Sequence, residues 1–241
     1  LFERMMTRRA DVVICANKER AEIMRGKYGL SKIPLTYENL RKLQYSSDED
    51  VETARVKFAP LINDDEIRIL SSSGCSFKRT NDLLVKNLCK VNKKCRLFLV
   101  GSYDASEADE IRKIAENDKV NTVSILGQLN QTELKYLISK IHIGIVNYGQ
   151  YDTNNRLCAS GKLYEFLYEG VPVVTTTNPP LKRICDESGV GVADDEYAEG
   201  INTVLANYEA FKRNIETFVI DNSIKGNDEK LISEISKIIR S

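Results

Sequence analysis

Two stretches of the chain combine charged side chains with backbone that could hold an anion. The first is "SSSGCSFKRTN" (71–81), in which Gly74 allows a close approach of the backbone. Lys78 and Arg79 stand just before a predicted helix, where two cations oppose the helix dipole and an anion is favoured. A bound anion would reconcile them, while a solvated basic turn explains this stretch alone equally well.

The second stretch is "YGQYDTNNRLCASGK" (148–162), longer than the two to six residues usual in α/β connections. It leads into a helix at whose N-terminus the backbone N–H groups of Gly161, Lys162 and Leu163 would be unpaired, as in many phosphate sites. Glu165 follows on the first turn, where its carboxylate could accept hydrogen bonds from vicinal hydroxyls such as those of a ribose. Alternatively, Glu165 is a first-turn acid that stabilises the helix dipole by up to about 1 kcal/mol.

The elements that must position these stretches alternate between strand and helix from about residue 64. Short continuous apolar strands separated by amphipathic helices predict a parallel sheet covered on both faces. The fold class is therefore predicted as α/β, a Rossmann-like doubly wound parallel sheet followed by C-terminal helices. The predicted strands are "EIRILSS" (66–72), "RLFLVG" (96–101), "NTVSILG" (121–127), "IHIGIVNY" (141–148), "VPVVTT" (171–176) and "GVGVA" (189–193). Ligands of such sheets bind outside the carboxyl ends of the strands, where both stretches lie.

Three further parts flank this unit. Residues 1–30 contain the strand-helix pair "ADVVICANKERAEIMRGKYG", which cannot bury its own apolar face and needs a partner layer. Residues 31–63 are predicted to be mainly loop and to form an interdomain linker. The predicted ligand-binding domain covers 64–205, and 206–241 are predicted as C-terminal helices whose apolar residues must pack on another element.

The composition argues against several classes of partner and site. Among 241 residues, 35 Lys and Arg balance 35 Asp and Glu, so no global basic field favours nucleic acid. No apolar run approaches the roughly 20 residues of a membrane helix. The six cysteines form no C-x-x-C pair and His142 is the one histidine, so we expect no metal site and a cytoplasmic protein with reduced thiols.

Two common nucleotide-binding motifs fit poorly. The string closest to G-x-G-x-x-G is "GVGVAD" (189–194), which lies late in the domain and lacks the third glycine. "ASGKLY" has the Gly-Lys pair of a P-loop without its first glycine or its hydroxyl. A dehydrogenase and a P-loop NTPase are therefore disfavoured.

Four stretches resemble a known family in their order and spacing. They are "ILSSSGCSFKRTNDLLVKNL", "RLFLVGSYD", "VSILGQLNQTELKYLISKIHIGIVNY" and "ASGKLYEFLYEGVPVVTTTNPPLKRIC". They look like the C-terminal, donor-binding half of GT-B fold glycosyltransferases of the retaining group-1 type, and residues 1–30 are similar to the end of the N-terminal, acceptor-side half. The resemblance covers roughly residues 9–215 and implies one half of a GT-B fold.

What the resemblance implies about function is a transferase that takes its sugar from a nucleoside diphosphate sugar and needs no metal. The acceptor would be an unknown saccharide or lipid-linked molecule, in polysaccharide or glycoconjugate biosynthesis. The setting it implies is the cytoplasm, with peripheral association at the inner face of a membrane.

The same resemblance implies roles for individual donor-binding residues. Glu165 corresponds to the acid on the ribose hydroxyls, and Lys78 and Arg79 lie where basic residues meet the diphosphate. Other positions border the sugar, the base or the phosphate through loops and backbone amides: Gly74, Gln128, Leu129, Ser160, Gly161, Lys162 and Leu163.

One departure from the family concerns the sugar end of the site. Many members carry two glutamates separated by seven residues, and the earlier position here is Leu157. The sugar-side acid is either missing or replaced by Asn154 or Asn155, and the catalytic residues stay open. If the 241 residues are the whole molecule, catalysis is not expected, because the acceptor side belongs to the other half.

Two alternatives to a glycosyltransferase stay open at this point. One is a non-catalytic, transferase-like partner subunit, which Leu157 favours. The other, less favoured, is a nucleotide-sugar epimerase, which would need acid-base groups that the single histidine does not supply.

Overall fold

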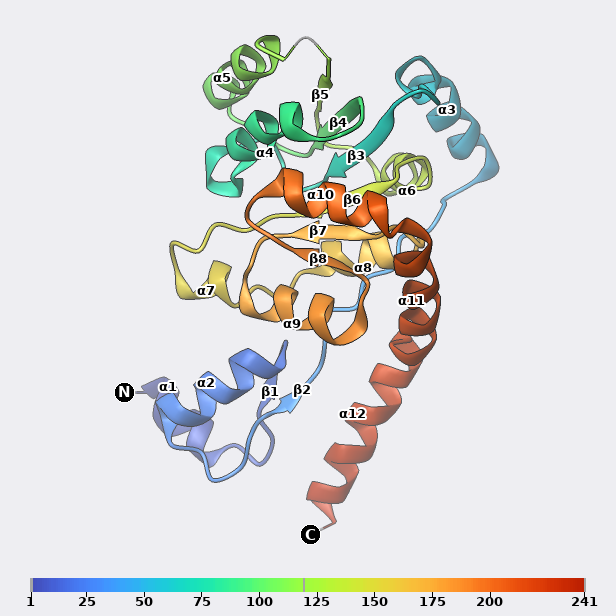
Figure 1. Ribbon diagram of the computed structural model, residues 1–241. Coiled ribbons are helices and arrows are strands. Elements are labelled where there is room, and N and C mark those ends of the chain that lie inside the picture. Colours follow the sequence, from blue (N-terminus) through green and yellow to red (C-terminus); the bar gives the residue numbers. More distant parts are fainter. Residues whose placement is uncertain (1, 119, 241) are drawn as a thin grey trace.

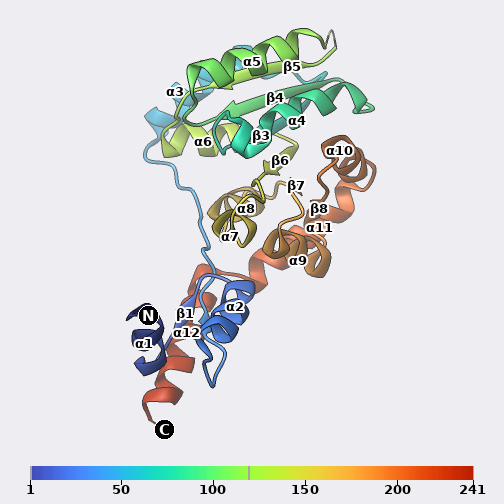
Figure 2. The ribbon, with the colours of Figure 1, turned by 90° about the vertical axis from the view of Figure 1, so that its left-hand side faces the viewer.

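A parallel sheet with helices on both faces forms the larger part of the computed structural model shown in Figure 1. The structure describes residues 2–118 and 120–240. A smaller unit, made of residues 2–36 and the C-terminal helix, lies at the end of the molecule opposite the upper strands of the sheet in both ribbon views (Figures 1 and 2).

The six strands of the larger sheet are all parallel and run in the order β5-β4-β3-β6-β7-β8. They are β3 (Ile67–Ser71), β4 (Cys95–Val100), β5 (Thr122–Leu126), β6 (Ile143–Val146), β7 (Val173–Thr175) and β8 (Gly191–Ala193). The chain builds outward from β3 to β5 and then returns to place β6 on the free side of β3. The switch in strand order therefore lies between β3 and β6. All six predicted strands and the doubly wound α/β class are confirmed.

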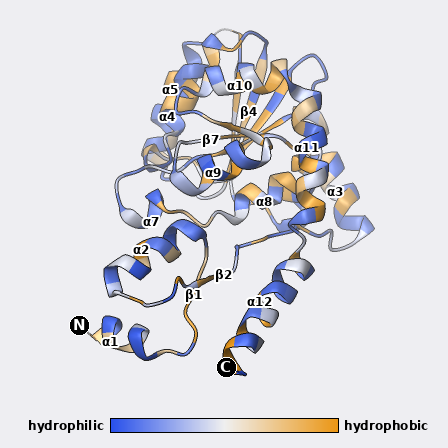
Figure 3. Cartoon of the chain, turned by 60° about the horizontal axis from the view of Figure 1, so that its bottom comes forward, coloured by the Kyte–Doolittle hydropathy of each residue, from blue (hydrophilic) through white to orange (hydrophobic). Residues whose placement is uncertain are grey.

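Alternate residues of the strands feed two separate cores. Leu97 and Leu99 of β4 belong to one buried cluster, and Phe98 and Val100 to the other. Successive side chains of a strand point to opposite faces, so the sheet is buried on both. Figure 3 shows the hydrophobic colour gathered in these strands. One face is covered by α4 (Asn81–Asn87), α5 (Ala105–Glu116) and α10 (Tyr197–Ala206), and the other by α3 (Asp48–Phe58), α6 (Gln131–Ile138), α8 (Gly161–Leu167), α9 (Pro179–Ser188) and α11 (Tyr208–Asp221).

Local sequence signals fix where several of these helices begin and end. Asn130 and Glu133 form a capping box at the start of α6, each side chain accepting from the other residue's backbone N–H. α9 begins with a proline, whose missing N–H is harmless there, and ends at Gly189 with a φ of 58°. Short 3-10 turns occur at Ala59–Leu61 (η1), Phe77–Arg79 (η2) and Leu88–Lys90 (η3).

The expectation that residues 31–63 are mainly loop is wrong for α3. Ser47 caps this helix by accepting from Asp50 N, and the acids of "DED" lie in its first turn, where they stabilise the dipole. Phe58 at its end is buried and its ring stacks on Tyr136 of α6, with centroids 6.4 Å apart. The acidic, serine-rich string around Ser47 is therefore the start of a helix and not a loop. The boundaries of the predicted domains stay predictions.

The smaller unit pairs two very short strands in parallel. It contains α1 (Phe2–Arg9), β1 (Ile14–Cys15), α2 (Lys18–Tyr28), β2 (Leu35–Thr36) and the long C-terminal helix α12 (Ile224–Ile239). Helix α12 contacts β2, which confirms that the tail packs as a helix on another element. In the described part of the chain, no helix combines the length and apolar character needed to cross a bilayer. All six cysteines are free thiols.

Candidate functional site

The loops that follow β3 and β6 meet at the switch in strand order and are tied together by Asn147. Its Oδ1 accepts from the Ser73 hydroxyl at 2.7 Å and from the Ser71 hydroxyl at 3.1 Å. Its amide donates to the backbone carbonyl of Arg79. Asn147 is fully buried and fixes the backbone that carries a predicted cationic residue. The sequence signal for it was a polar amide directly after the apolar strand "IGIV".

Thr80 adds a constraint to the same loop. It is the one non-glycine with a positive φ, at 55°, among the described residues. This conformation is costly for a residue with a Cβ and persists where the surroundings enforce it. The Thr80 hydroxyl is 2.5 Å from that of Tyr197, which is buried in the core. The turn after Arg79 is therefore held by tertiary contacts.

Arg79 and Lys78 differ sharply in their surroundings. The Arg79 guanidinium lies over the ring of Tyr148, 4.4 Å from its centroid, and its Nη1 atom is buried without a hydrogen-bond partner. Lys78 is exposed. A buried donor left unpaired is costly, and a bound anion would satisfy it. Of the predicted basic pair, the structure therefore places Arg79 at the sheet edge and leaves Lys78 in solvent.

Lys162, on the first turn of α8, joins this edge from the other side. Its ammonium donates to the backbone carbonyl of Ser72. Burial lowers the pKa of Lys162 to about 8, Glu165 opposes that shift, and the like charges of Arg79 and Arg41 add to it. These three cations and one carboxylate act on one another, so the edge carries surplus positive charge.

Glu165 does not lie where the sequence suggested. Helix α8 begins at Gly161, so Glu165 falls one turn further in, and it is buried rather than open to a ligand. Its Oε1 is 2.9 Å from Nε of Arg41. Burial raises the pKa of Glu165 against the opposing charges of Arg41 and Lys162. Arg41 belongs to the segment predicted as a linker, and no local pattern could have paired it with α8.

The two asparagines predicted for the sugar have other partners. The Asn154 side chain accepts from Nη2 of Arg20, and that of Asn155 donates to Asp152 in the cap of α7 (Thr153–Arg156). Leu157 is buried, and its carbonyl accepts from Nε of Arg20 at 2.7 Å. This part of the loop is thus fastened to α2.

Four other predicted positions have contacts that the structure defines. Ser160 is buried and its hydroxyl accepts from Tyr148 at 3.2 Å. Gly74 has a φ of 87°, and a Cβ there would lie 2.4 Å from the Ser102 carbonyl, so this glycine permits two loops to approach. Leu129 packs on the core and Gln128 is exposed. Their predicted ligand contacts stay predictions.

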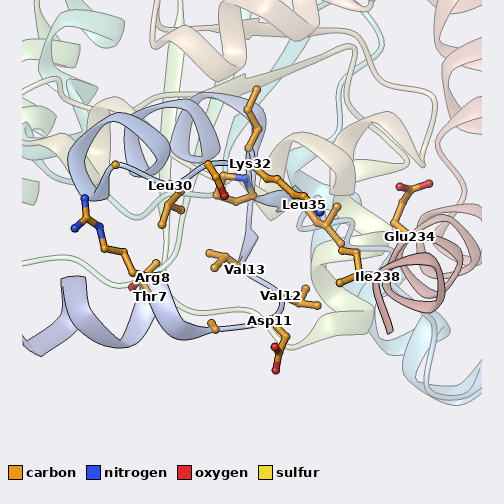
Figure 4. Close-up of a pocket in the computed structure, with 15 residues that line it drawn as sticks. Thr7, Arg8, Asp11, Val12, Val13, Leu30, Lys32, Leu35, Glu234 and Ile238 are labelled. Atoms are coloured by element: carbon orange, nitrogen blue, oxygen red, sulfur yellow. The ribbon is translucent and has the colours of Figure 1, made fainter. Parts of the chain in front are cut away.

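The described residues line several cavities that could hold a ligand. A cavity of about 230 Å³ opens beside Tyr148 at the sheet edge, lined also by Thr80, Gln150, Thr176 and Asp195. A larger cavity, about 540 Å³, lies in the smaller unit between the end of α1 with the segment that follows it, the segment that leads into β2, and α12 (Figure 4). Figure 4 shows Val12, Val13 and Leu35 at its centre, with Arg8, Asp11 and Glu234 around them. The first cavity adjoins the predicted site at the start of the 148–162 loop, and a third, of about 420 Å³, reaches the sugar end of that loop at Asn154 and Leu157.

The described residues contain no cluster of three or more His, Cys, Asp or Glu side chains that could hold a metal ion. His142 lies at the opposite end of β6, where its Nδ1 accepts from Arg68 N at 2.9 Å. The expectation that the reaction needs no metal stays a prediction.

Comparison with known proteins settles the family. The profile described as "Glycosyl transferases group 1" matches residues 68–207. The chain belongs to this family. No match is found among curated proteins.

Solved structures agree in fold. HepE from Anabaena, in complex with UDP and glucose, has a TM-score of 0.70 at 13% identity, over 98% of this chain and 66% of that one. WaaG, a glycosyltransferase involved in lipopolysaccharide biosynthesis, has a TM-score of 0.66 at 15% identity, over 90% and 60%. A glycosyltransferase from Rickettsia africae ESF-5 has a TM-score of 0.72 at 12% identity, over 99% and 67%.

These alignments confirm that the six-stranded unit is one half of a GT-B fold. The group 1 transferase chain thus spans about 60 to 67% of the length of these proteins.

Proposed function

We propose that this chain supplies the donor-binding half of a glycosyltransferase that moves a sugar from a nucleoside diphosphate sugar to a saccharide or lipid-linked acceptor. The observation that carries the proposal is the pair of cations Arg79 and Lys162 at the switch between β3 and β6, where Nη1 of Arg79 is buried without a hydrogen-bond partner and the Lys162 ammonium reaches the Ser72 carbonyl. A diphosphate would match the surplus positive charge. Membership of the group 1 family supports sugar transfer as the chemistry.

The role of the cations is to stabilise the departing nucleoside diphosphate. Negative charge grows on that group as the bond to the sugar breaks, and donors fixed beforehand stabilise it most. Arg79 is held by the Asn147 amide and the Tyr148 ring, and Lys162 by the Ser72 carbonyl. Binding of the anion favours the charged ammonium of Lys162 and so raises its pKa again. The proposal assigns no step to a metal ion.

The remaining donor contacts are proposed from the family resemblance. The loop with Gln128 and Leu129 borders the base, the backbone of 160–163 meets phosphate, and Gly74 faces the sugar. Asn154 or Asn155 takes the place of the missing sugar-side acid, by exchanging its present partner, Arg20 for Asn154 and Asp152 for Asn155, for a hydroxyl of the sugar. Glu165 binds the ribose hydroxyls once its carboxylate is accessible.

The setting is proposed from the relatives. WaaG is described as acting in lipopolysaccharide biosynthesis, and HepE was solved with UDP and glucose. We infer a uridine or other nucleoside diphosphate sugar as donor and polysaccharide or glycoconjugate assembly as the process. Work in the cytoplasm at the inner face of a membrane belongs to the same proposal.

Calorimetric titration of the folded chain with UDP, GDP and ADP tests the donor site. A charge-assisted contact to phosphate contributes about 1.5–3 kcal/mol, so Arg79→Ala and Lys162→Met should each weaken binding by roughly ten- to a hundredfold. Lys78→Ala is the matched control, because Lys78 is exposed on the same loop, and it should change affinity by less than about threefold. A folded chain that binds no nucleoside diphosphate overturns the proposal.

A second candidate is a non-catalytic partner subunit, which one observation favours. Leu157 replaces the sugar-side acid and is buried, with its carbonyl bonded to α2. Assay of nucleotide-sugar turnover by the full natural chain, with and without its host's extract, separates the two. Turnover by the purified chain alone supports the enzyme, and turnover that requires a second protein supports the partner subunit.

A further inference from the structure

Residues 37–43, here called the strap, cross the N-terminal end of α8 on their way to the sheet. The Asn39 side chain donates to the carbonyl of Ala159 at 3.1 Å. A Cβ placed on Gly161 would lie 3.2 Å from Nδ2 of Asn39 and 3.4 Å from the Cβ of Arg41. The strap therefore packs on the part of α8 that the proposed function assigns to the donor.

Both ends of the strap are fastened. At one end the Tyr37 hydroxyl donates to Asp228 at 2.6 Å, and Asn227 donates to the carbonyl of Glu38 at 3.1 Å, both on α12. At the other end Leu43 is buried in the core of the sheet. With its ends held, the strap presents Arg41 at a fixed place beside Glu165.

The Arg41–Glu165 pair is unequally buried. The Arg41 side chain is 61% exposed, and the Glu165 side chain is 3% exposed. The guanidinium can turn into water without moving the strap, whereas the carboxylate cannot leave the base of the site. With Arg41 in place, the covered carboxylate is closed to vicinal hydroxyls.

We propose that Arg41 is an autoinhibitory cap on the donor site, holding Glu165 in the ligand-free chain until the donor ribose displaces it. This rests on the proposed function, which gives Glu165 to the ribose. The donor then binds only those molecules in which the guanidinium has turned away from Glu165. A cap closed about nine-tenths of the time lowers apparent affinity roughly tenfold.

The test is a titration of wild type and Arg41→Gln with a nucleoside and its diphosphate: uridine with UDP, guanosine with GDP, and adenosine with ADP. For the base that wild type binds, removing the cap should raise the affinity for the nucleoside and for its diphosphate by about tenfold each. Lys42→Gln is the matched control, since it removes the same charge from the neighbouring strap residue, whose ammonium lies 5.9 Å from the Tyr168 ring centroid. It should leave both affinities unchanged.

The double variant Arg41→Gln with Glu165→Gln makes the test specific to the pair. If Arg41 acts only through Glu165, its removal should give no gain once the carboxylate is gone. Thermal unfolding checks that each variant is folded, and Arg41→Lys, which keeps a cation without the guanidinium, should show a smaller gain. If Arg41→Gln does not fold, Arg41→Lys decides: the cap is overturned if this variant binds the probes no more tightly than wild type.

The outcomes separate the cap from the donor site. Weaker UDP binding by Arg41→Gln with unchanged uridine binding would make Arg41 a phosphate ligand and overturn the cap. Unchanged affinity for both also overturns it. In either case, wild-type binding would leave the proposed function standing, whereas a folded wild type that binds none of the six probes overturns both.

Discussion

The two parallel sheets of this chain differ in how far they bury their strands. Ile145 in β6 is 1% exposed, whereas Ile14 in β1 is 45% exposed. The six-stranded sheet has helices on both faces, while β1 and β2 are two residues long and have their main helix contacts with α2 and α12. A strand becomes rigid core only where layers cover both its faces. The cationic edge with Arg79 and Lys162 belongs to the well-covered six-stranded sheet. The 540 Å³ cavity belongs to the smaller unit, and the strap connects the two.

The largest effect that sharpens this comparison comes from truncating one apolar residue in each unit. Leu97→Ala empties a fully buried place in β4 and should cost about 2–5 kcal/mol of unfolding free energy. Ile232→Ala on α12, where the side chain is 63% exposed, should cost less than about 0.5 kcal/mol. Urea unfolding curves measure both. Similar losses would show that the smaller unit buries α12 as firmly as the sheet buries β4.

The change Gly→Ala should have a smaller effect on the free energy of unfolding, with opposite signs at one glycine of each unit. A Cβ on Gly144 of β6 would lie 2.5 Å from the buried Phe166 ring, so Gly144→Ala should destabilise by about 1–3 kcal/mol. Gly26 is exposed inside α2 with nothing within 4 Å, so Gly26→Ala should stabilise by about 0.5–1 kcal/mol. Thermal unfolding of the two variants gives the signs. Destabilisation by both would contradict the packing assigned to α2.

Donor binding should weaken as the pH rises, because Lys162 has a pKa lowered to about 8. The free chain loses this ammonium across that pH, whereas a bound anion raises the pKa and keeps the charge. Affinity for the nucleoside diphosphate should therefore fall by up to roughly tenfold between pH 7 and 9, and the fall is larger the more the anion raises the pKa. Stability moves the other way. The unfolded chain holds the Lys162 proton up to about 10.5, so this group adds stability as pH rises from about 8 to 10.5.

Lys162→Arg is the control for that profile. Its guanidinium stays charged throughout, so the affinity of a folded variant should change little between pH 7 and 9. Calorimetry at several pH values measures both proteins. An equal fall in the variant and the wild type would assign the titration to another group.

Much of the larger sheet was predictable because its strands are continuous apolar runs, as in "RLFLVG", and because loops after parallel strands meet at one edge. Arg79 and Lys162 were found in this way. Arg41 and Asn147 were not, since their roles come from contacts between segments far apart in the sequence. Helix α3 was missed because its Ser47 cap and first-turn acids have the composition of a linker. Local patterns therefore gave the sheet and its loops, and tertiary packing decided which charges are covered.

Hydrogen-deuterium exchange with and without saturating UDP, or whichever nucleoside diphosphate binds, tests the central claim most directly. If the donor site is the cationic edge of the rigid sheet, protection should appear at 71–80, 147–152 and 160–165, together with a change in the strap. Protection confined to 7–13, 30–35 and 234–238, around the cavity of the smaller unit, would contradict the account.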